Sequence, residues 1–200
     1  MAVHCDQAQS LWRRGWTVGL RSLPSAPVWQ RAPPTAPMFI LHCTAKLRDR
    51  LKQQLQIVRS PTTTRLGDWY ATALFWKPQV ALLVNERTLL PVILPLAPAD
   101  SLLERIGPAV AQVLARHGVG AQLIEAEATA MAQIAIAKTA NRSVVGTMNE
   151  FAFEAKVYRD HGGTTDLIEL SMRLAETPCG AIKYDSPSRL LRTIMAGSSH

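Results

Sequence analysis

The chain has 200 residues, of which 48% are hydrophobic and 18% charged, and its formal net charge is +7. A chain of this length can bury one substantial core, and no stretch approaches the roughly 18 consecutive apolar residues of a membrane-spanning helix. The three cysteines show no CxxC pair and no zinc-site spacing, so we expect a reducing cytoplasm, no metal and no cofactor. The modest positive charge permits an anionic partner such as nucleic acid, but many ordinary soluble domains carry a similar charge.

The first 37 residues differ in composition from the rest of the chain. They include three of the five tryptophans, five prolines, and four arginines against a single acidic residue. Arginines interrupt every apolar run that could serve as a secretory signal. We therefore predict that residues 1–37 are a disordered extension or the product of a mis-called start, and that the domain begins at Met38.

From residue 38 the hydrophobic pattern predicts a strand followed by a helix. Residues 39–43 form a short apolar run, and Thr44 is a typical helix N-cap. Leucines then recur at every fourth position: Leu47, Leu51 and Leu55. His42 and Cys43 are neighbours on the predicted strand, so their side chains point to opposite faces and are poorly placed to share a metal ion.

The next part of the chain predicts three strands in an antiparallel meander. Residues 69–76, 80–84 and 89–94 are rich in β-branched, aromatic and other apolar residues, and short breaks separate them. The polar residues 85–88 form the second connection. Asn85 is expected to take the left-handed turn conformation there.

The second half of the chain predicts mainly helices. Helical periodicity runs from Ser101 to about residue 117, over residues 121–132, over residues 142–159, and again in a helix that ends near Thr177. Residues 133–138 alternate isoleucine with small residues, which indicates a half-buried strand.

These elements define the predicted architecture. We expect an α+β fold with a mixed, mainly antiparallel sheet of about five strands and four or five packed helices. A single domain would span residues 38–185, and residues 186–200 would form a tail.

The densest group of specific polar residues lies where the strand at 133–138 ends and the next helix begins. Lys138 and Arg142 supply positive charge, and Ser143 and the first helical turn supply hydrogen-bond donors. This pattern predicts a site for a phosphate or carboxylate, to which the hairpin after Val84 could contribute. The predicted anion or partner site comprises Lys138, Asn141, Arg142, Ser143, Asn149, Asn85 and Glu86.

The same residues also have a structural interpretation. Thr139 or Asn141 would cap the helix, and the neighbouring serine would bond locally. Arg142 would pair with a carboxylate such as Glu150 or Glu86. The glycines and the GK[ST] ending of a nucleotide-binding P-loop are missing, which argues against nucleoside triphosphate hydrolysis.

Aromatic residues offer further candidates for a binding surface. Phe153 lies among polar residues on the outer side of the 142–159 helix, so the fold or a partner should cover it. Four residues of the first meander strand could stack on nucleic-acid bases: Trp69, Tyr70, Phe75 and Trp76. Strand alternation places at least half of these four in the core. Cys179 is the best-placed thiol but is more typical of a small buried residue.

Four motifs occur in order along the body of the chain: HCTAKL at 42–47, NERTL at 85–89, KTANRSVVGTMNEF at 138–151 and RLAETPCGAIKY at 173–184. Together they resemble a family of small bacterial domains described as a domain of unknown function. The resemblance covers about residues 38–185. It implies a single bacterial α+β domain and carries no activity, cofactor or catalytic residue with it.

Three functional hypotheses follow. The first is a non-enzymatic binding or regulatory module for an anionic ligand, nucleic acid or protein partner. The second is an enzyme acting on a phosphorylated or nucleotide substrate, in which Lys138 and Arg142 hold phosphate and Glu150 or Glu86 is the acid or base. The third is a structural interaction domain with Phe153 at its interface. The sequence leaves open whether the protein is an enzyme.

Overall fold

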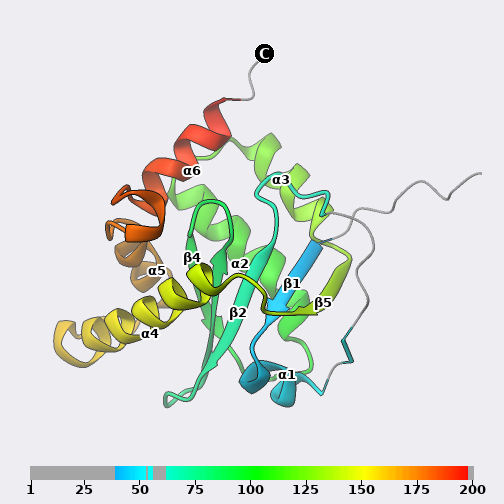
Figure 1. Cartoon of the computed structure of the whole chain (residues 1–200), viewed down its shortest axis with the longest axis vertical. Helices are drawn as coiled ribbons and strands as arrows, with labels where there is room; N and C mark the ends of the chain where they lie inside the picture. Colours follow the sequence, from blue (N-terminus) through cyan, green and yellow to red (C-terminus); the bar gives the residue numbers. More distant parts are fainter. Residues whose placement is uncertain (1–38, 53, 56–61, 198–200) are drawn as a thin grey trace, which may run out of the picture. The chain divides into compact units, whose positions relative to one another are not determined.

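A mixed five-stranded sheet forms the centre of the described part of the chain, residues 39–52, 54–55 and 62–197 of a computed structural model (Figure 1). The strands are β1 (Phe39–Cys43), β2 (Trp69–Leu74), β3 (Val80–Asn85), β4 (Pro91–Pro95) and β5 (Ile134–Lys138). Their order in the sheet is β4-β3-β2-β1-β5. All described residues fall in one unit that spans residues 35–200. Residues 1–37, predicted to be an extension, lie outside the described residues.

The predicted antiparallel meander is present as β2, β3 and β4, with ladders of six and five residue pairs. β1 lies between β2 and β5 and is parallel to both, with ladders of three and five pairs. The sheet is therefore mixed and mainly antiparallel, as predicted. Parallel neighbours need long crossover connections. One helix supplies the connection from β1 to β2, and two helices supply the connection from β4 to β5.

Six α-helices surround this sheet in the described residues. They are α1 (Ala45–Leu51), α2 (Leu102–Arg116), α3 (Ala121–Ala130), α4 (Arg142–Gly162), α5 (Leu167–Ala175) and α6 (Pro187–Ala196). A short 3-10 helix, η2 (Gly180–Ile182), precedes α6. None of the helices in the described ranges is both long enough and apolar enough to cross a membrane.

The sixth helix, α6, lies in the segment predicted to be a tail, residues 186–200. The Ser186 side chain accepts a hydrogen bond from the first turn, and Pro187 occupies the first helical position, where its missing N–H costs nothing. Leu191 and Met195, four residues apart, are buried in the core. The helix forms because the rest of the domain covers its apolar side. A helix this short is not stable without such packing, so the sequence pattern alone did not predict it.

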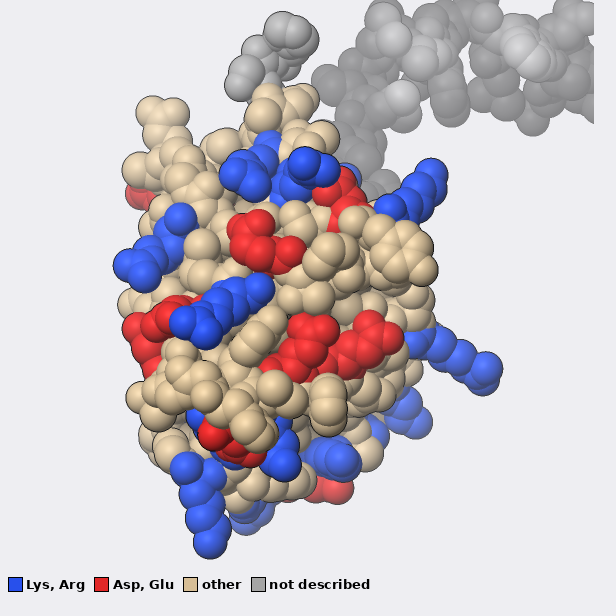
Figure 2. Space-filling model, turned by 90° about the vertical axis from the view of Figure 1, so that its left-hand side faces the viewer, with Lys and Arg blue, Asp and Glu red and all other residues tan. Residues whose placement is uncertain are grey.

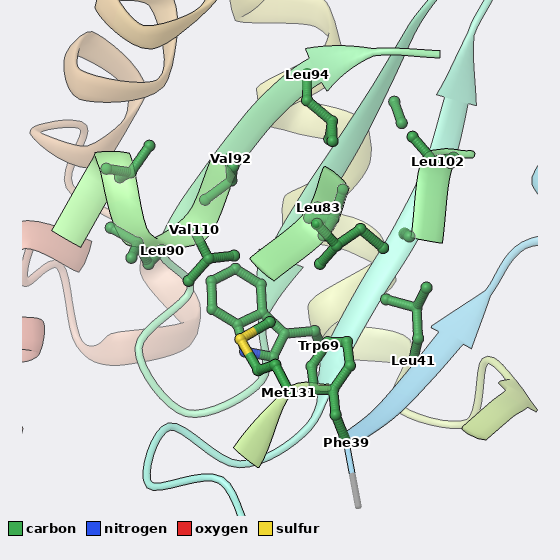
Figure 3. Close-up of a cluster of buried hydrophobic side chains, with 14 of the residues drawn as sticks. Phe39, Leu41, Trp69, Leu83, Leu90, Val92, Leu94, Leu102, Val110 and Met131 are labelled. Carbon is green, nitrogen blue, oxygen red and sulfur yellow. The ribbon is translucent and has the colours of Figure 1, made fainter. Parts of the chain in front are cut away.

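One face of the sheet packs against α1 and α2, and α6 belongs to the same core cluster. Strand alternation sends Leu41 of β1, Trp69 of β2 and Leu83 of β3 to this face. Figure 3 shows these side chains close to Leu102 and Val110 of α2. In Figure 1, α2 lies behind the sheet.

The opposite face of the sheet packs against α4 and α5. Tyr70 of β2 and Leu82 and Val84 of β3 point to this face, where Met148 and Phe151 of α4 cover them. Figure 1 shows α4 in front of the sheet. Because β3 is buried on both faces, it is apolar at nearly every position instead of alternating.

The connection between β3 and β4 differs in one respect from the prediction. The left-handed conformation occurs at Leu89, with φ of 56°, and not at Asn85. The Oδ1 atom of Asn85 accepts hydrogen bonds from the N–H groups of Arg87 and Thr88, at 3.1 and 2.9 Å. The asparagine therefore builds the turn through its side chain and leaves the unusual backbone conformation to a later residue.

The edge strand β4 offers few free hydrogen-bond donors. Pro91 and Pro95 have no N–H group, and the N–H of Ile93 donates to the Ser171 hydroxyl of α5 at 2.8 Å. Arg105 of α2 donates to the Pro95 carbonyl at 2.7 Å. Proline and a covering helix both protect a sheet edge from pairing with another chain.

Replacing Ser171 by alanine tests how much its hydrogen bond to β4 stabilises the fold. Ser171→Ala leaves the buried N–H of Ile93 without its acceptor, so we expect the free energy of unfolding to fall by about 1–3 kcal/mol. Urea denaturation of the full chain measures the change. The control is Ser101→Ala, since the Ser101 side chain caps no helix, and it should change stability by less than about 0.5 kcal/mol. Equal effects of the two substitutions would contradict the assignment.

Candidate functional site

The candidate site lies at the carboxyl ends of the parallel neighbours β1 and β5 (Figure 1). From β1 the chain enters α1, whose Leu47 joins the core on one face of the sheet. From β5 it enters α4, whose Val144 joins the core on the opposite face. In open sheets, ligands commonly bind beyond adjacent strand ends from which the chain leaves to opposite faces.

Four polar residues at this place have exposed side chains: Lys46, Lys138, Arg142 and Ser143. We call these four residues the β1–β5 edge. Lys138 is the last residue of β5, and Arg142 and Ser143 are the first residues of α4. Within residues 39–52, 54–55 and 62–197, no ion pair involves any of the three cations.

Asn141 caps the start of α4, one of the two caps, Thr139 or Asn141, that the structural interpretation of the sequence proposed. Its Oδ1 accepts hydrogen bonds from the N–H groups of Ser143 and Val144, at 3.0 and 3.4 Å. Its Nδ2 donates to Oε1 of Glu86 at 3.0 Å, and its own N–H donates to the Tyr70 hydroxyl at 3.1 Å. The cap therefore also fastens α4 to the sheet and to the β3–β4 connection.

Beneath this cap lies the ring of His42, which stacks on Tyr70 with 4.5 Å between ring centroids and 18° between planes. The Nδ1 atom of His42 lies 2.8 Å from the Lys138 carbonyl oxygen, and Nε2 lies 2.9 Å from Oδ2 of Asp68. A carbonyl and a carboxylate oxygen can only accept hydrogen bonds. Both hydrogen bonds can therefore form together only when each ring nitrogen carries a proton, so they favour the imidazolium form of His42.

The electrostatics of His42 agree with this protonation state. Burial lowers the pKa of His42, since only 14% of its side chain is exposed. The hydrogen bonds to Asp68 and to the Lys138 carbonyl, with the negative charges of Asp68 and Glu86, outweigh burial and raise the pKa above 6.5. His42 thus acts as a charged link between segments and is poorly suited to be a general base.

The segment that carries Asp68 is held by buried side chains. Both carboxylate oxygens of the buried Glu127 on α3 accept backbone N–H bonds, from Arg65 at 2.8 Å and Leu66 at 3.2 Å. The Nδ2 atom of Asn85 donates to the carbonyls of Leu66 and Asp68, at 3.0 and 3.2 Å. Desolvation raises the pKa of Glu127, although the N–H bonds and the charge of Arg65 oppose it.

The structure divides the seven residues of the predicted site into two groups. Lys138, Arg142, Ser143 and Asn149 have exposed side chains, and in the described residues no hydrogen bond or ion pair of these side chains is present. Asn85, Glu86 and Asn141 instead bond within the fold. The expected pairing of Arg142 with Glu150 or Glu86 does not occur among the described residues.

His42, Asp68, Tyr70 and Glu127 were not among the predicted site residues. The alternation along β1 places His42 on an inward face, and an inward-facing histidine in an apolar strand needs polar partners. Its partners Asp68 and Lys138 lie 26 and 96 residues away in the sequence. Only the strand order brings them together.

The remaining candidates are structural or lie elsewhere. Cys43 and Cys179 are buried free thiols, and desolvation raises the pKa of Cys43 to about 12 and that of Cys179 to about 11. Neither thiol is therefore a ready nucleophile. In the part of the chain that the structure describes, no group of three or more His, Cys, Asp or Glu residues could hold a metal ion.

Comparison with known proteins finds one family. A family model described as "Domain of unknown function (DUF6933)" matches residues 40–190. This match agrees closely with the residues 38–185 expected from the motifs. Neither curated proteins nor solved structures give a match.

The raised pKa of His42 predicts a pH-dependent contribution to stability. A raised folded-state pKa stabilises the fold below the unfolded value of 6.5, and this stabilisation is lost as the pH rises through the folded-state value. We expect the stability difference between the native chain and His42→Gln to be largest near pH 6 and to shrink by about pH 9. Urea denaturation across this range measures it.

The exposed His161 provides the control for this experiment, since His161→Gln should leave the pH profile unchanged. NMR of the His42 ring provides a direct readout, because an imidazolium shows two protonated nitrogens. A neutral His42 at pH 6, or a pH-independent difference, would contradict the assignment.

Asn141 allows the cap and the bond to Glu86 to be separated. Asn141→Ala removes both, and we expect a loss of about 1–3 kcal/mol in unfolding free energy. Asn141→Ser keeps a capping oxygen but loses the amide donor to Glu86, so it should fall between the native chain and Asn141→Ala. Thermal and urea denaturation measure the series. Equal stability of the alanine and serine variants would show that the cap contributes little.

Proposed function

Because the chain belongs to a family described only as a domain of unknown function, we propose from its geometry that it is a non-enzymatic binding module that holds an anionic ligand at the β1–β5 edge. The cations of the edge supply the charge, and the Ser143 hydroxyl supplies a donor. The proposal keeps Lys138, Arg142 and Ser143 from the site predicted by the sequence and adds Lys46 of α1.

One observation carries this proposal. Lys138 is the last residue of β5, and Arg142 is the first residue of α4. Both side chains are exposed without an acidic partner among the described residues. The nearby acids are bonded elsewhere, since Asp68 bonds to His42 and Glu86 accepts from Asn141. Adjacent free cations at the positive end of a helix dipole attract an anion.

The geometry also indicates how the ligand would be held. Asn141 already occupies the N–H groups of Ser143 and Val144. These amides cannot serve a bound phosphate in the manner of an uncapped helix. The side chains of Lys138, Arg142 and Ser143 must therefore make the principal contacts, with Asn149 two turns along α4 available to a longer ligand.

The enzyme hypothesis has weaker support. It requires Glu86 or Glu150 as an acid or base beside Lys138 and Arg142. Glu86 accepts hydrogen bonds from Asn141 and, at 3.5 Å, from Tyr70, and both are structural contacts. Glu150 lies two turns beyond Arg142 on α4.

A protein partner is a second candidate, favoured by Phe153. This side chain is 69% exposed, and Val157, one turn further along α4, is 39% exposed. Phe153 shares the outer side of α4 with Arg142 and Asn149. A partner covering this side would bury apolar surface and contact the same cations.

We also propose that the protein is bacterial and cytoplasmic. The unpaired thiols of Cys43 and Cys179 support a reducing environment.

Calorimetric titration of the full chain with inorganic pyrophosphate tests the anion site. We expect binding by the native chain, and a loss of affinity of about tenfold in Arg142→Ala and in Lys138→Ala, since each removes one charge-assisted contact. Arg189→Ala is the matched control, because Arg189 of α6 is also exposed but pairs with Asp185. Its affinity should equal that of the native chain.

Circular dichroism and thermal denaturation establish that the variants stay folded, as expected for exposed side chains. No binding by the native chain, or equal losses in all three variants, would overturn the proposal.

A further inference from the structure

The ion pairs of the protein are unevenly distributed. In the described residues, every ion pair of a lysine or arginine lies on α4, on α5, or at the start of α6. The cations of α1, of the β2–β3 connection and of the β1–β5 edge take part in none of them. Figure 2 shows lysine and arginine side chains over the whole of one face, including several at its lower end, the end at which Figure 1 places α1.

The helix α1 and its C-cap concentrate positive charge. The nine residues that follow β1 carry four cations against the single acid Asp49: Lys46, Arg48, Arg50 and Lys52. Lys46, Arg50 and Lys52 are exposed. A cluster of like charges without counter-ions among the described residues favours a polyanionic partner, because each phosphate bound by the cluster releases a counter-ion.

An exposed aromatic ring lies next to these cations. Phe75 follows β2 and is 56% exposed, and the guanidinium of Arg50 lies 5.8 Å from its ring centroid. Arg50 also donates to Oε1 of Gln79 across the same connection, at 2.6 Å. These contacts place the guanidinium of Arg50 beside the Phe75 ring. Lys77, two residues beyond Phe75, is exposed and unpaired among the described residues.

These positions follow one edge of the sheet. β5, β1 and β2 are parallel neighbours, so Lys138, α1 and the connection after β2 all lie at the same carboxyl edge. Three strand spacings separate β5 from β3, or about 14 Å. The cations therefore form a row from the β1–β5 edge, across α1, to Phe75 and Lys77.

We propose that the anionic ligand is single-stranded nucleic acid, whose phosphates lie along this row and one of whose bases stacks on Phe75. This inference rests on the proposed anion site, which would hold one phosphate at Lys138 and Arg142. An exposed aromatic ring beside a basic row binds unpaired bases, because every base has a stacking face. A duplex keeps those faces inside its own stack, and a lipid headgroup has no such face.

Fluorescence anisotropy with a labelled 15-nucleotide oligothymidine tests the proposal on the full chain. Affinity should fall as salt is raised, because each neutralised phosphate releases counter-ions. Lys46→Ala, Lys52→Ala and Lys77→Ala should each weaken binding and reduce the log–log salt slope by about 0.7. The ion-paired Arg173 of α5 provides the control, since Arg173→Ala should change neither quantity.

Substitutions of Phe75 separate the contribution of base stacking to binding from the contribution of charge. Phe75→Ala should weaken oligonucleotide binding about fivefold or more, and Phe75→Trp should retain it. Neither substitution should alter the binding of inorganic pyrophosphate. This contrast also separates the two proposals, because pyrophosphate reports only on the anion site.

The remaining outcomes are decisive. Pyrophosphate binding that depends on Arg142, without oligonucleotide binding, would retain the proposed function and overturn this inference. Binding that is indifferent to Phe75→Ala, or that is tighter for a duplex of the same length, would overturn it as well. Binding to vesicles of phosphatidylglycerol and phosphatidylcholine, with none to the oligonucleotide, would assign the row to a membrane surface and would equally overturn it.

Discussion

The two hydrogen bonds of the His42 ring hold together the region on which the candidate site depends. They join β1 to Asp68, just before β2, and to the Lys138 carbonyl at the end of β5. Because both acceptors require a proton, the bonds favour a positive charge on His42 between two strand ends. The Tyr70 ring stacked on His42 carries the hydroxyl that receives the Asn141 N–H, so the same link also positions the start of α4.

This arrangement separates the charges of the region into two classes. The carboxylates of Asp68, Glu86 and Glu127 accept hydrogen bonds from within the domain and stabilise its connections. Lys138 and Arg142 stand at the surface with no such role among the described residues. Groups that are committed to one another seldom exchange protons with a substrate, whereas free cations remain available to an anion. This division is the basis of our proposal that the protein binds an anion without catalysing a reaction.

The fold explains why the cations collect at one end. β1 lies between two parallel strands, so the polar connections that follow β1, β2 and β5 meet at the same edge of the sheet. The acids of α4, α5 and the segment before α6 pair with cations of those same segments. A positive end results from topology and local pairing, although the chain as a whole carries only a moderate charge.

The sequence by itself determined most element types, the antiparallel meander and the family, and it narrowed the cap of α4 to Thr139 or Asn141, because these depend on periodicity and on residues close along the chain. It could not show that α6 forms, since a short amphipathic segment is stable only where a core accepts its apolar side. Nor could it separate Asn85 and Glu86, which bond inside the fold, from Lys138 and Arg142, which face solvent. The tertiary structure decided these points, because strand order and register bring together His42, Asp68 and Lys138 from distant parts of the chain, and burial then determines which polar groups are left for a ligand.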